Sequence, residues 1–272
     1  MLPNNITGKR EDRLPIVVTG EGTSKLLAVP ALPNGTAATE AEAIRQAIVD
    51  WDLADKIVAM SFDTTNTNSG CRNGVITRLP EMLGKKLLPL ACRHHVAELV
   101  LKHCFEMKGD KSQSDKLDKF KRFQEEFNAK LNSGETLKHR NVLSVPRLNK
   151  ITASWRQSVI EFCSNQLIEK QPRGDYIELL ELVVLFLGGN LPKNVKFRKA
   201  GSISRARWMA RAIYVLKIWM NHGNFKICDE ELMGHYETLC IFISKCYVRY
   251  WFSLNNPVCI LVFVLNMHEI IY

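Results

Sequence analysis

Targeting and membrane-spanning segments are missing from this sequence. Its first stretch, Met1–Arg13, is polar and charged and lacks the apolar region of a secretory signal. The longest apolar run, Val258–Leu265, is far shorter than the ~20 residues that cross a bilayer. We therefore expect a nuclear or cytoplasmic protein that is neither secreted nor inserted in a membrane.

Signatures of several enzyme classes are also missing. Gly20-Glu21-Gly22 lacks the length and the Gly-Lys-Ser/Thr ending of a phosphate-binding loop, which argues against an NTPase. The patterns Gly-x-Ser-x-Gly and His-Glu-x-x-His do not occur. The 8 cysteines are scattered from Cys71 to Cys259, unlike those of a small disulfide-rich domain, so we expect reduced thiols.

Acidic residues are missing from one long segment, between Leu182 and Cys228. Nine basic residues lie in it: Lys193, Lys196, Arg198, Lys199, Arg205, Arg207, Arg211, Lys217 and Lys226. The net charge is +9, and the rest of the chain balances, because 37 minus 9 basic residues equals the 28 acidic ones. Such a segment is typical of a surface that binds polyanions, although an ordinary solvated surface can have the same composition.

Residues 14–105 alternate between strand and helix patterns. Short apolar runs predict strands at 14–19, 25–29, 56–62 and 87–91, the first two forming a hairpin and the third buried on both faces. Helical spacing predicts two helices between these strands, the first capped by Thr39 and Glu42. This order predicts an α/β layer with a mixed sheet.

Beyond residue 105 the spacing of apolar residues is helical. Helices are expected at 151–169, 176–187, 204–220 and 230–251, separated by proline and glycine. We therefore expect four parts: a polar segment (1–13), an α/β domain (14–105), a helical domain (106–254) and an apolar tail of uncertain origin (255–272).

Asp63 directly follows the predicted strand 56–62. A carboxylate at the end of a buried strand lies where open α/β sheets place their chemistry. It could be one ligand of a divalent cation such as Mg²⁺ or Mn²⁺, although a site needs more than one carboxylate. The alternative is structural, with Asp63 closing an Asx turn or capping the next helix.

Cys92-Arg-His-His95 follows the next strand. Zinc would need two further ligands, and Cys71, His94, His103 and Cys104 do not supply a second pair at a zinc spacing. A nucleophilic Cys–His pair would need an orienting Asn or Asp that we do not identify. Packing of Cys92 and His95 at the start of a helix is the interpretation that we favour.

Arg205, Arg207, Trp208 and Arg211 lie at the start of another predicted helix. Arginines neutralise phosphates and an indole can stack on an unpaired base, so these residues predict DNA binding. The alternative is a core Trp208 among solvated arginines.

These features, in this order, resemble those of hAT-type DNA transposases and proteins derived from them. The resemblance rests on Ser61-Phe62-Asp63, on Cys92-Arg-His-His95-Val-Ala-Glu-Leu99 and on Arg207-Trp208, and it covers roughly residues 14 to 250. It implies an RNase H-like sheet followed by a helical insertion, with two Asp and a Glu that hold Mg²⁺ or Mn²⁺ for hydrolysis and strand transfer.

Two of these three acids have no counterpart in the sequence. The family's first Asp lies on an opening strand before the hairpin, where Glu11 and Asp12 are poor substitutes in a polar segment. Its Glu follows the whole insertion, whereas Glu230, Glu231 and Glu237 lie on a predicted insertion helix. We therefore predict a DNA-binding, catalytically inactive protein. An active nuclease core within a longer product, a protein-interaction module and a non-functional fragment remain alternatives.

Overall fold

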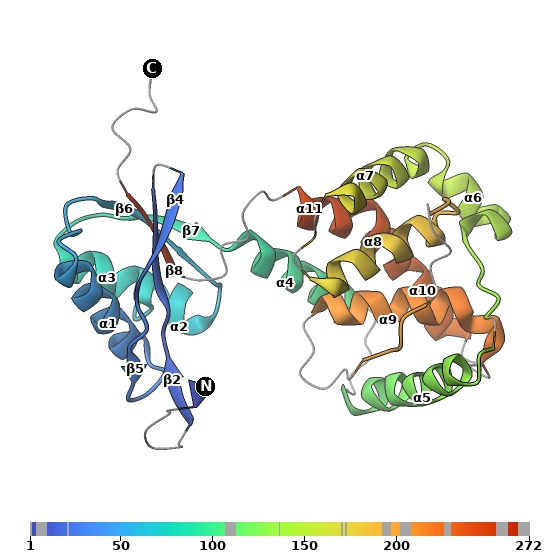
Figure 1. Ribbon diagram of the computed structural model, residues 1–272, viewed down its shortest axis with the longest axis horizontal. Helices are drawn as coiled ribbons and strands as arrows, with labels where there is room; N and C mark the ends of the chain where they lie inside the picture. Colours follow the sequence, from blue (N-terminus) through green and yellow to red (C-terminus); the bar gives the residue numbers. More distant parts are fainter. Residues whose placement is uncertain are drawn as a thin grey trace. The chain divides into compact units, whose positions relative to one another are not determined.

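The computed structural model (Figure 1) describes residues 2–3, 10–20, 22–106, 113–135, 137–169, 171, 173–191, 197–201, 208–225, 230–253 and 261–265. The fold is mixed α/β and mostly helical. It divides into two compact units, 1–96 with 256–272, and 97–255. No helix within the described ranges is both long and apolar enough to cross a membrane.

The described residues of the first unit form two β-sheets and three helices, and helix α4 begins at the end of this unit. Its elements are β1 (Leu2–Pro3), β2 (Arg10–Arg13), β3 (Ile16–Gly20), β4 (Thr23–Ala28), β5 (Ala31–Leu32), α1 (Ala37–Asp50), β6 (Ile57–Phe62), α2 (Asn66–Ser69), α3 (Val75–Leu83), β7 (Leu88–Ala91) and β8 (Leu261–Leu265). The larger sheet has the order β4-β3-β8-β6-β7, and the smaller sheet has the order β1-β2-β5. The α/β layer expected from the sequence is therefore present.

The middle of the larger sheet comes from the opposite end of the chain. Strand β8 pairs in parallel with β3 and antiparallel with β6, and thereby joins the β3–β4 hairpin to the parallel pair β6–β7. Residues 255–272 had no predicted place, because a run of apolar residues indicates burial but not a partner. The polar segment 1–13 likewise contains two strands that were not expected, β1 and β2.

Helices α1 and α3 pack against the larger sheet. Ile44 and Ile48 of α1 and Leu79 of α3 are fully buried in one cluster with Ile16 of β3 and Ile57 of β6. Burying an aliphatic side chain of this size stabilises the fold by about 1.5–3 kcal/mol. This cluster is the hydrophobic core of the first unit.

The start of α1 differs from the prediction. Thr36 is the N-cap residue, and its side chain accepts a hydrogen bond from the Thr39 backbone N–H. The Thr39 hydroxyl donates to the Asn34 carbonyl instead of capping the helix itself. The predicted cap was therefore wrong by three residues, because Thr36 and Thr39 carry the same capping group.

All secondary-structure elements in the described part of the second unit are helical. Its elements are α4 (Arg93–Glu106), which begins in the first unit, α5 (Gln113–Asn132), η1 (Val142–Ser144), α6 (Pro146–Thr152), α7 (Arg156–Ile168), α8 (Gly174–Phe186), α9 (Trp208–Asn221), η2 (His222–Asn224), α10 (Glu230–Phe242), the π-helical turn η3 (Ile243–Tyr247) and α11 (Val248–Phe252). The boundary lies at residue 96, before the expected 105, because α4 already contributes Ala97, Leu101 and Phe105 to the helical core.

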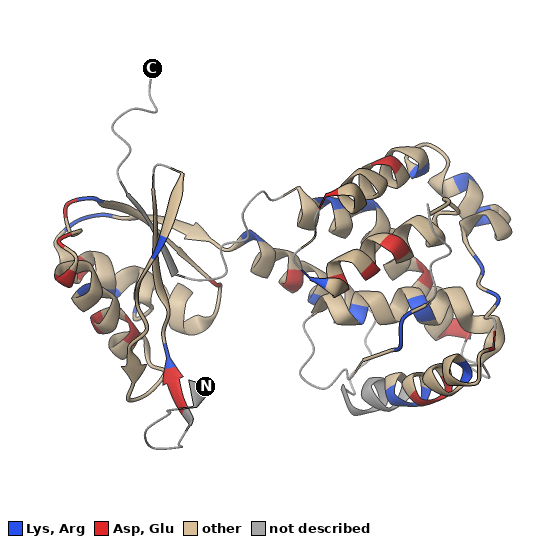
Figure 2. Cartoon of the chain, in the orientation of Figure 1, with Lys and Arg blue, Asp and Glu red and all other residues tan. Residues whose placement is uncertain are grey.

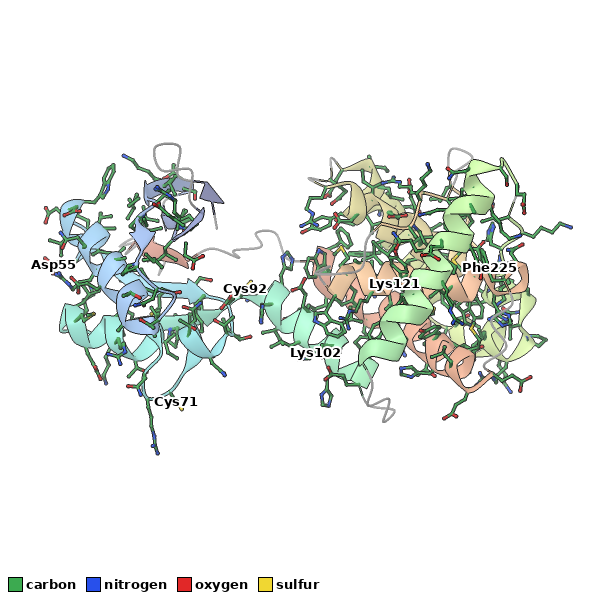
Figure 3. All side chains as sticks on the ribbon, turned by 90° about the horizontal axis from the view of Figure 1, so that it is seen from below. Asp55, Cys71, Cys92, Lys102, Lys121 and Phe225 are labelled. Carbon is green, nitrogen blue, oxygen red and sulfur yellow. The ribbon has the colours of Figure 1, made fainter. Side chains whose placement is uncertain are left out.

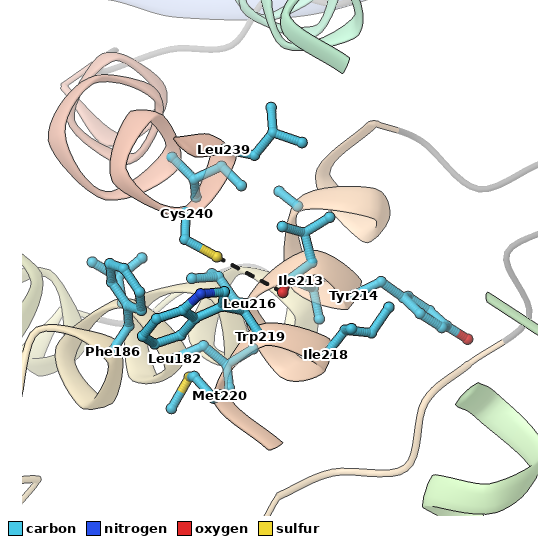
Figure 4. Close-up of a cluster of buried hydrophobic side chains, with 14 of the residues drawn as sticks. Leu182, Phe186, Ile213, Tyr214, Leu216, Ile218, Trp219, Met220, Leu239 and Cys240 are labelled. Carbon is cyan, nitrogen blue, oxygen red and sulfur yellow. Dashed lines mark hydrogen bonds between the residues drawn. The ribbon is translucent and has the colours of Figure 1, made fainter. Parts of the chain in front are cut away.

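Helices α8, α9 and α10 meet around Trp219, which is completely buried (Figure 4). The Trp219 ring packs edge-on against Phe186 with a centroid distance of 5.0 Å. The thiol of Cys240 on α10 donates to the Val215 carbonyl of α9 at 3.8 Å. Burial raises the pKa of this thiol well above its ordinary value, as expected of a cysteine that packs in a core.

Candidate functional site

The sheet places Asp63 and the Cys92–His95 segment at the same edge. Phe62 of β6 pairs in parallel with Ala91 of β7, so the carboxyl ends of both strands lie side by side. The Cys92 backbone N–H donates to the Phe62 carbonyl at 2.7 Å, one residue before Asp63. Two of the three motifs found in the sequence are thus neighbours in the fold.

Asp63 is bound tightly by its own loop. Its Oδ1 accepts hydrogen bonds from the Thr65 backbone N–H at 3.1 Å, the Thr65 hydroxyl at 2.6 Å and the Asn68 amide at 2.8 Å. Burial acts to raise the pKa of Asp63, but these hydrogen bonds and the attraction of His95 outweigh it and lower the pKa. Asp63 therefore closes an Asx turn before α2, as the structural interpretation predicted.

A second carboxylate, Glu40, lies near Asp63. Glu40 is in the first turn of α1, and both burial and the charge of Asp63 raise its pKa. The sequence analysis missed this residue, because an acid in the first turn of a helix is ordinary. Only the packing of α1 on the sheet places Glu40 beside the strand end.

The segment that follows Asp63 contains two buried neutral oxygen atoms. Thr64 Oγ1 and Asn68 Oδ1 are buried, and neither has a hydrogen-bond partner in the described part of the chain. Carboxylate and neutral oxygens are the ligands that Mg²⁺ prefers. However, no three His, Cys, Asp or Glu side chains come together as a metal-binding group within the described ranges. The structure therefore places two carboxylates, Asp63 and Glu40, near each other at this strand end, with the neutral oxygens of Thr64 and Asn68 in the adjoining segment.

Cys92 lies immediately before α4 (Figure 3) and is only 3% exposed. Its carbonyl accepts the hydrogen bond from the Val96 backbone N–H that begins the helix. His94 is also buried, and His95 is half-buried beside Asp63. This arrangement agrees with the packing interpretation of the motif, in which Cys92 and His95 support the strand-to-helix connection.

Trp208 begins α9 in the second unit, whereas Arg205 and Arg207 lie outside the described residues. The Trp208 ring packs against Phe105 with a centroid distance of 5.7 Å, and the Arg211 guanidinium lies 4.0 Å from the Trp208 ring centroid. Burial lowers the pKa of Arg211, while Glu106 acts in the opposite direction. A nucleic-acid base that stacked on this indole would have to share it with Arg211.

Two cations of the basic segment are paired with acids of α8. Lys217 is 1% exposed, and its Nζ lies 2.6 Å from Glu178 Oε1. Arg198 Nη2 lies 3.1 Å from Glu181. Burial lowers the pKa of Lys217 despite its acidic partner. The expected basic surface therefore carries less positive charge than the sequence count, because Lys217 and Arg198 are paired with carboxylates, the first pair buried and the second partly exposed.

Comparison of the chain with models of protein families, with curated proteins and with solved structures finds no match.

Proposed function

We propose that this protein binds nucleic acid and derives from a hAT-type transposase whose RNase H-like layer has lost its catalytic function. The placement of Asp63 beside the Cys92–His95 segment, at the carboxyl ends of two parallel strands, carries this proposal. It matches the order of motifs on which the resemblance rests. The net charge of +9 supports a polyanionic partner.

Strand β8 supports the RNase H-like part of the proposal in an indirect way. In the family, an opening strand that carries the first catalytic Asp precedes the hairpin, whereas the strand β2 that precedes the hairpin here pairs with β1 and β5 in the smaller sheet. Without β8, no other strand would join the hairpin to the β6–β7 pair in the observed sheet order. We therefore infer that β8 takes the place of the opening strand in the sheet order only, because it runs antiparallel to β6 and its carboxyl end lies at the sheet edge opposite Asp63.

The hydrogen bonds of Asp63 support a structural role for this carboxylate. All three donors bind Oδ1, so a cation would have to bind through Oδ2. The test is to incubate the purified chain with a labelled DNA duplex in Mg²⁺ or Mn²⁺, and we expect no cleavage. Cleavage that Asp63→Ala abolishes would show that the protein is an active nuclease.

Metal-dependent DNA hydrolysis is the second candidate, and Glu40 favours it. Asp63 and Glu40, with the buried oxygens of Thr64 and Asn68, could hold one hydrated divalent cation. This alternative predicts that Glu40→Gln impairs cleavage as strongly as Asp63→Ala does. An activity that survives both substitutions would come from another site or from a contaminating nuclease.

Binding is tested separately, by titrating a labelled duplex with the protein at several salt concentrations. The logarithm of the association constant should fall linearly with the logarithm of the salt concentration. Arg207→Ala should reduce the slope by about 1 if this arginine contacts a phosphate. A chain without affinity for DNA at low salt would instead be an interaction module or a non-functional fragment.

A further inference from the structure

A second segment without acidic residues lies between Glu135 and Glu161, in the helical unit. Its basic residues are Lys138, Arg140, Arg147, Lys150 and Arg156. Figure 2 shows lysine and arginine along α6 and along the chain that leads to it. This segment contains fewer basic residues than the one between Leu182 and Cys228. Counting charges along the sequence therefore does not single it out.

Three of these cations lie on α6 or at the start of α7, and neighbouring side chains orient two of them. Arg147 pairs with Glu237 of α10. Arg156 donates from Nη1 to Asn149 Oδ1 at 2.6 Å, so its partner is neutral and its charge is retained. Lys150 is exposed, one turn after Arg147. The buried residues of α6, Leu148 and Thr152, lie on its other side.

Two further cations, from η3 and α11, lie beside α7. Lys245 Nζ lies 5.7 Å from the ring centroid of Trp155, the residue before α7. Arg249 donates from Nη2 to the Ser158 hydroxyl of α7 at 2.5 Å. We call the resulting set the α6 basic surface: Arg147, Lys150, Arg156, Lys245 and Arg249. Five cations less the charge of Glu237 leave +4 on it.

The chemistry of this surface suits phosphate groups. Arg156 and Arg249 are held by an amide and a hydroxyl, which orient the guanidinium without neutralising it. A guanidinium held in this way keeps further N–H donors for phosphate oxygens, and less side-chain entropy is lost when it binds. In the segment between Leu182 and Cys228, by contrast, Arg198 and Lys217 are paired with carboxylates.

We infer that the α6 basic surface contacts the sugar–phosphate backbone of duplex DNA. This inference rests on the proposed nucleic-acid binding and adds a surface apart from the Arg207-Trp208 motif. A membrane fits the surface less well, because helices that lie on a bilayer insert a broad apolar face. The inward side of α6 is already buried in the protein core.

The test compares two double variants that remove the same charge. Lys150→Gln/Lys245→Gln alters the α6 basic surface, and Lys56→Gln/Lys86→Gln removes two exposed lysines of the other unit. Binding of a fluorescent duplex of arbitrary sequence is followed by anisotropy from about 50 to about 200 mM KCl. The salt slope should fall by about 2 in the first variant and stay near that of the wild type in the second.

Each of the other possible outcomes rejects either the α6 basic surface, the proposed nucleic-acid binding or the choice of DNA as the partner. Three equal slopes, or equal reductions in the two variants, would reject the α6 basic surface and leave nucleic-acid binding intact. Wild-type protein without salt-dependent affinity for the duplex would reject the proposed function together with the surface. Binding to vesicles that contain phosphatidylserine in preference to the duplex would assign the surface to a membrane. Circular dichroism checks that both variants keep the wild-type fold.

Discussion

The buried ion pair between Lys217 and Glu178 offers a strong test of the helical unit. Lys217→Met removes an ammonium group that is 1% exposed and leaves Glu178, whose side chain is 14% exposed, without its cation. Breaking a buried pair costs about 3–5 kcal/mol, and the partial exposure of Glu178 favours the lower end. The Arg198 carbonyl also loses its hydrogen bond from Nζ, which adds about 1 kcal/mol. We expect a loss of about 4 kcal/mol.

Urea unfolding followed by far-ultraviolet circular dichroism measures this loss, since the unit is helical. In Lys217→Met/Glu178→Gln no buried charge is left unpaired, so we expect the double variant to be more stable than Lys217→Met alone by about 2 kcal/mol. The salt slope of DNA binding should not change in Lys217→Met. A variant as stable as the wild type, with a reduced salt slope, would place Lys217 in solvent and refute the reasoning.

The pH dependence gives an independent check on the same lysine. Burial lowers the pKa of Lys217, so the unfolded chain holds this proton at a pH where the folded protein has begun to release it. The contribution of Lys217 to the free energy of unfolding should therefore rise with pH, up to the ordinary lysine pKa near 10.4. The stability of the wild type relative to Lys217→Met should increase over this range, and a decrease would contradict the assignment.

Three further predictions concern the first unit. Asp63→Ala should cost about 1 kcal/mol near neutral pH, because the half-exposed carboxylate loses three hydrogen bonds. Since the folded pKa of Asp63 is lowered, the difference from the wild type in urea unfolding should begin to shrink below about pH 3.9 and be lost as the pH falls through the folded pKa. Glu40→Gln should stabilise the protein by less than about 1 kcal/mol at pH 7 but not below about pH 4.3, because the folded pKa of Glu40 is raised; a loss of stability at pH 7 would contradict this. Phe263→Pro should remove a hydrogen-bond donor from β8 and cost about 3 kcal/mol. Amide exchange in β3 and β6 should then accelerate, and unchanged exchange would argue against the placement of β8.

The secondary structure of both units could largely be predicted from the sequence. The periods of apolar residues distinguish helix from strand locally, and β6 is buried on both faces except at Val58, as its uninterrupted apolar run indicated. The position of Asp63 after this strand and the start of a helix after Cys92 follow from the same local patterns. The wrong cap of α1 and the unexpected strands β1 and β2 lie where local signals are ambiguous.

Only the tertiary structure decided which strands and charged side chains that are distant in the sequence pair with each other. The sequence by itself determined that 255–272 is apolar, that Glu40 begins a helix and that Lys217 belongs to a basic segment. Packing then paired β8 with β3 and β6, brought Glu40 near Asp63 and joined Lys217 to Glu178. Hydrophobic burial is not directional. The pattern of apolar residues therefore predicts which side chains are buried, but it does not specify which strands pair or which charged side chains come into contact.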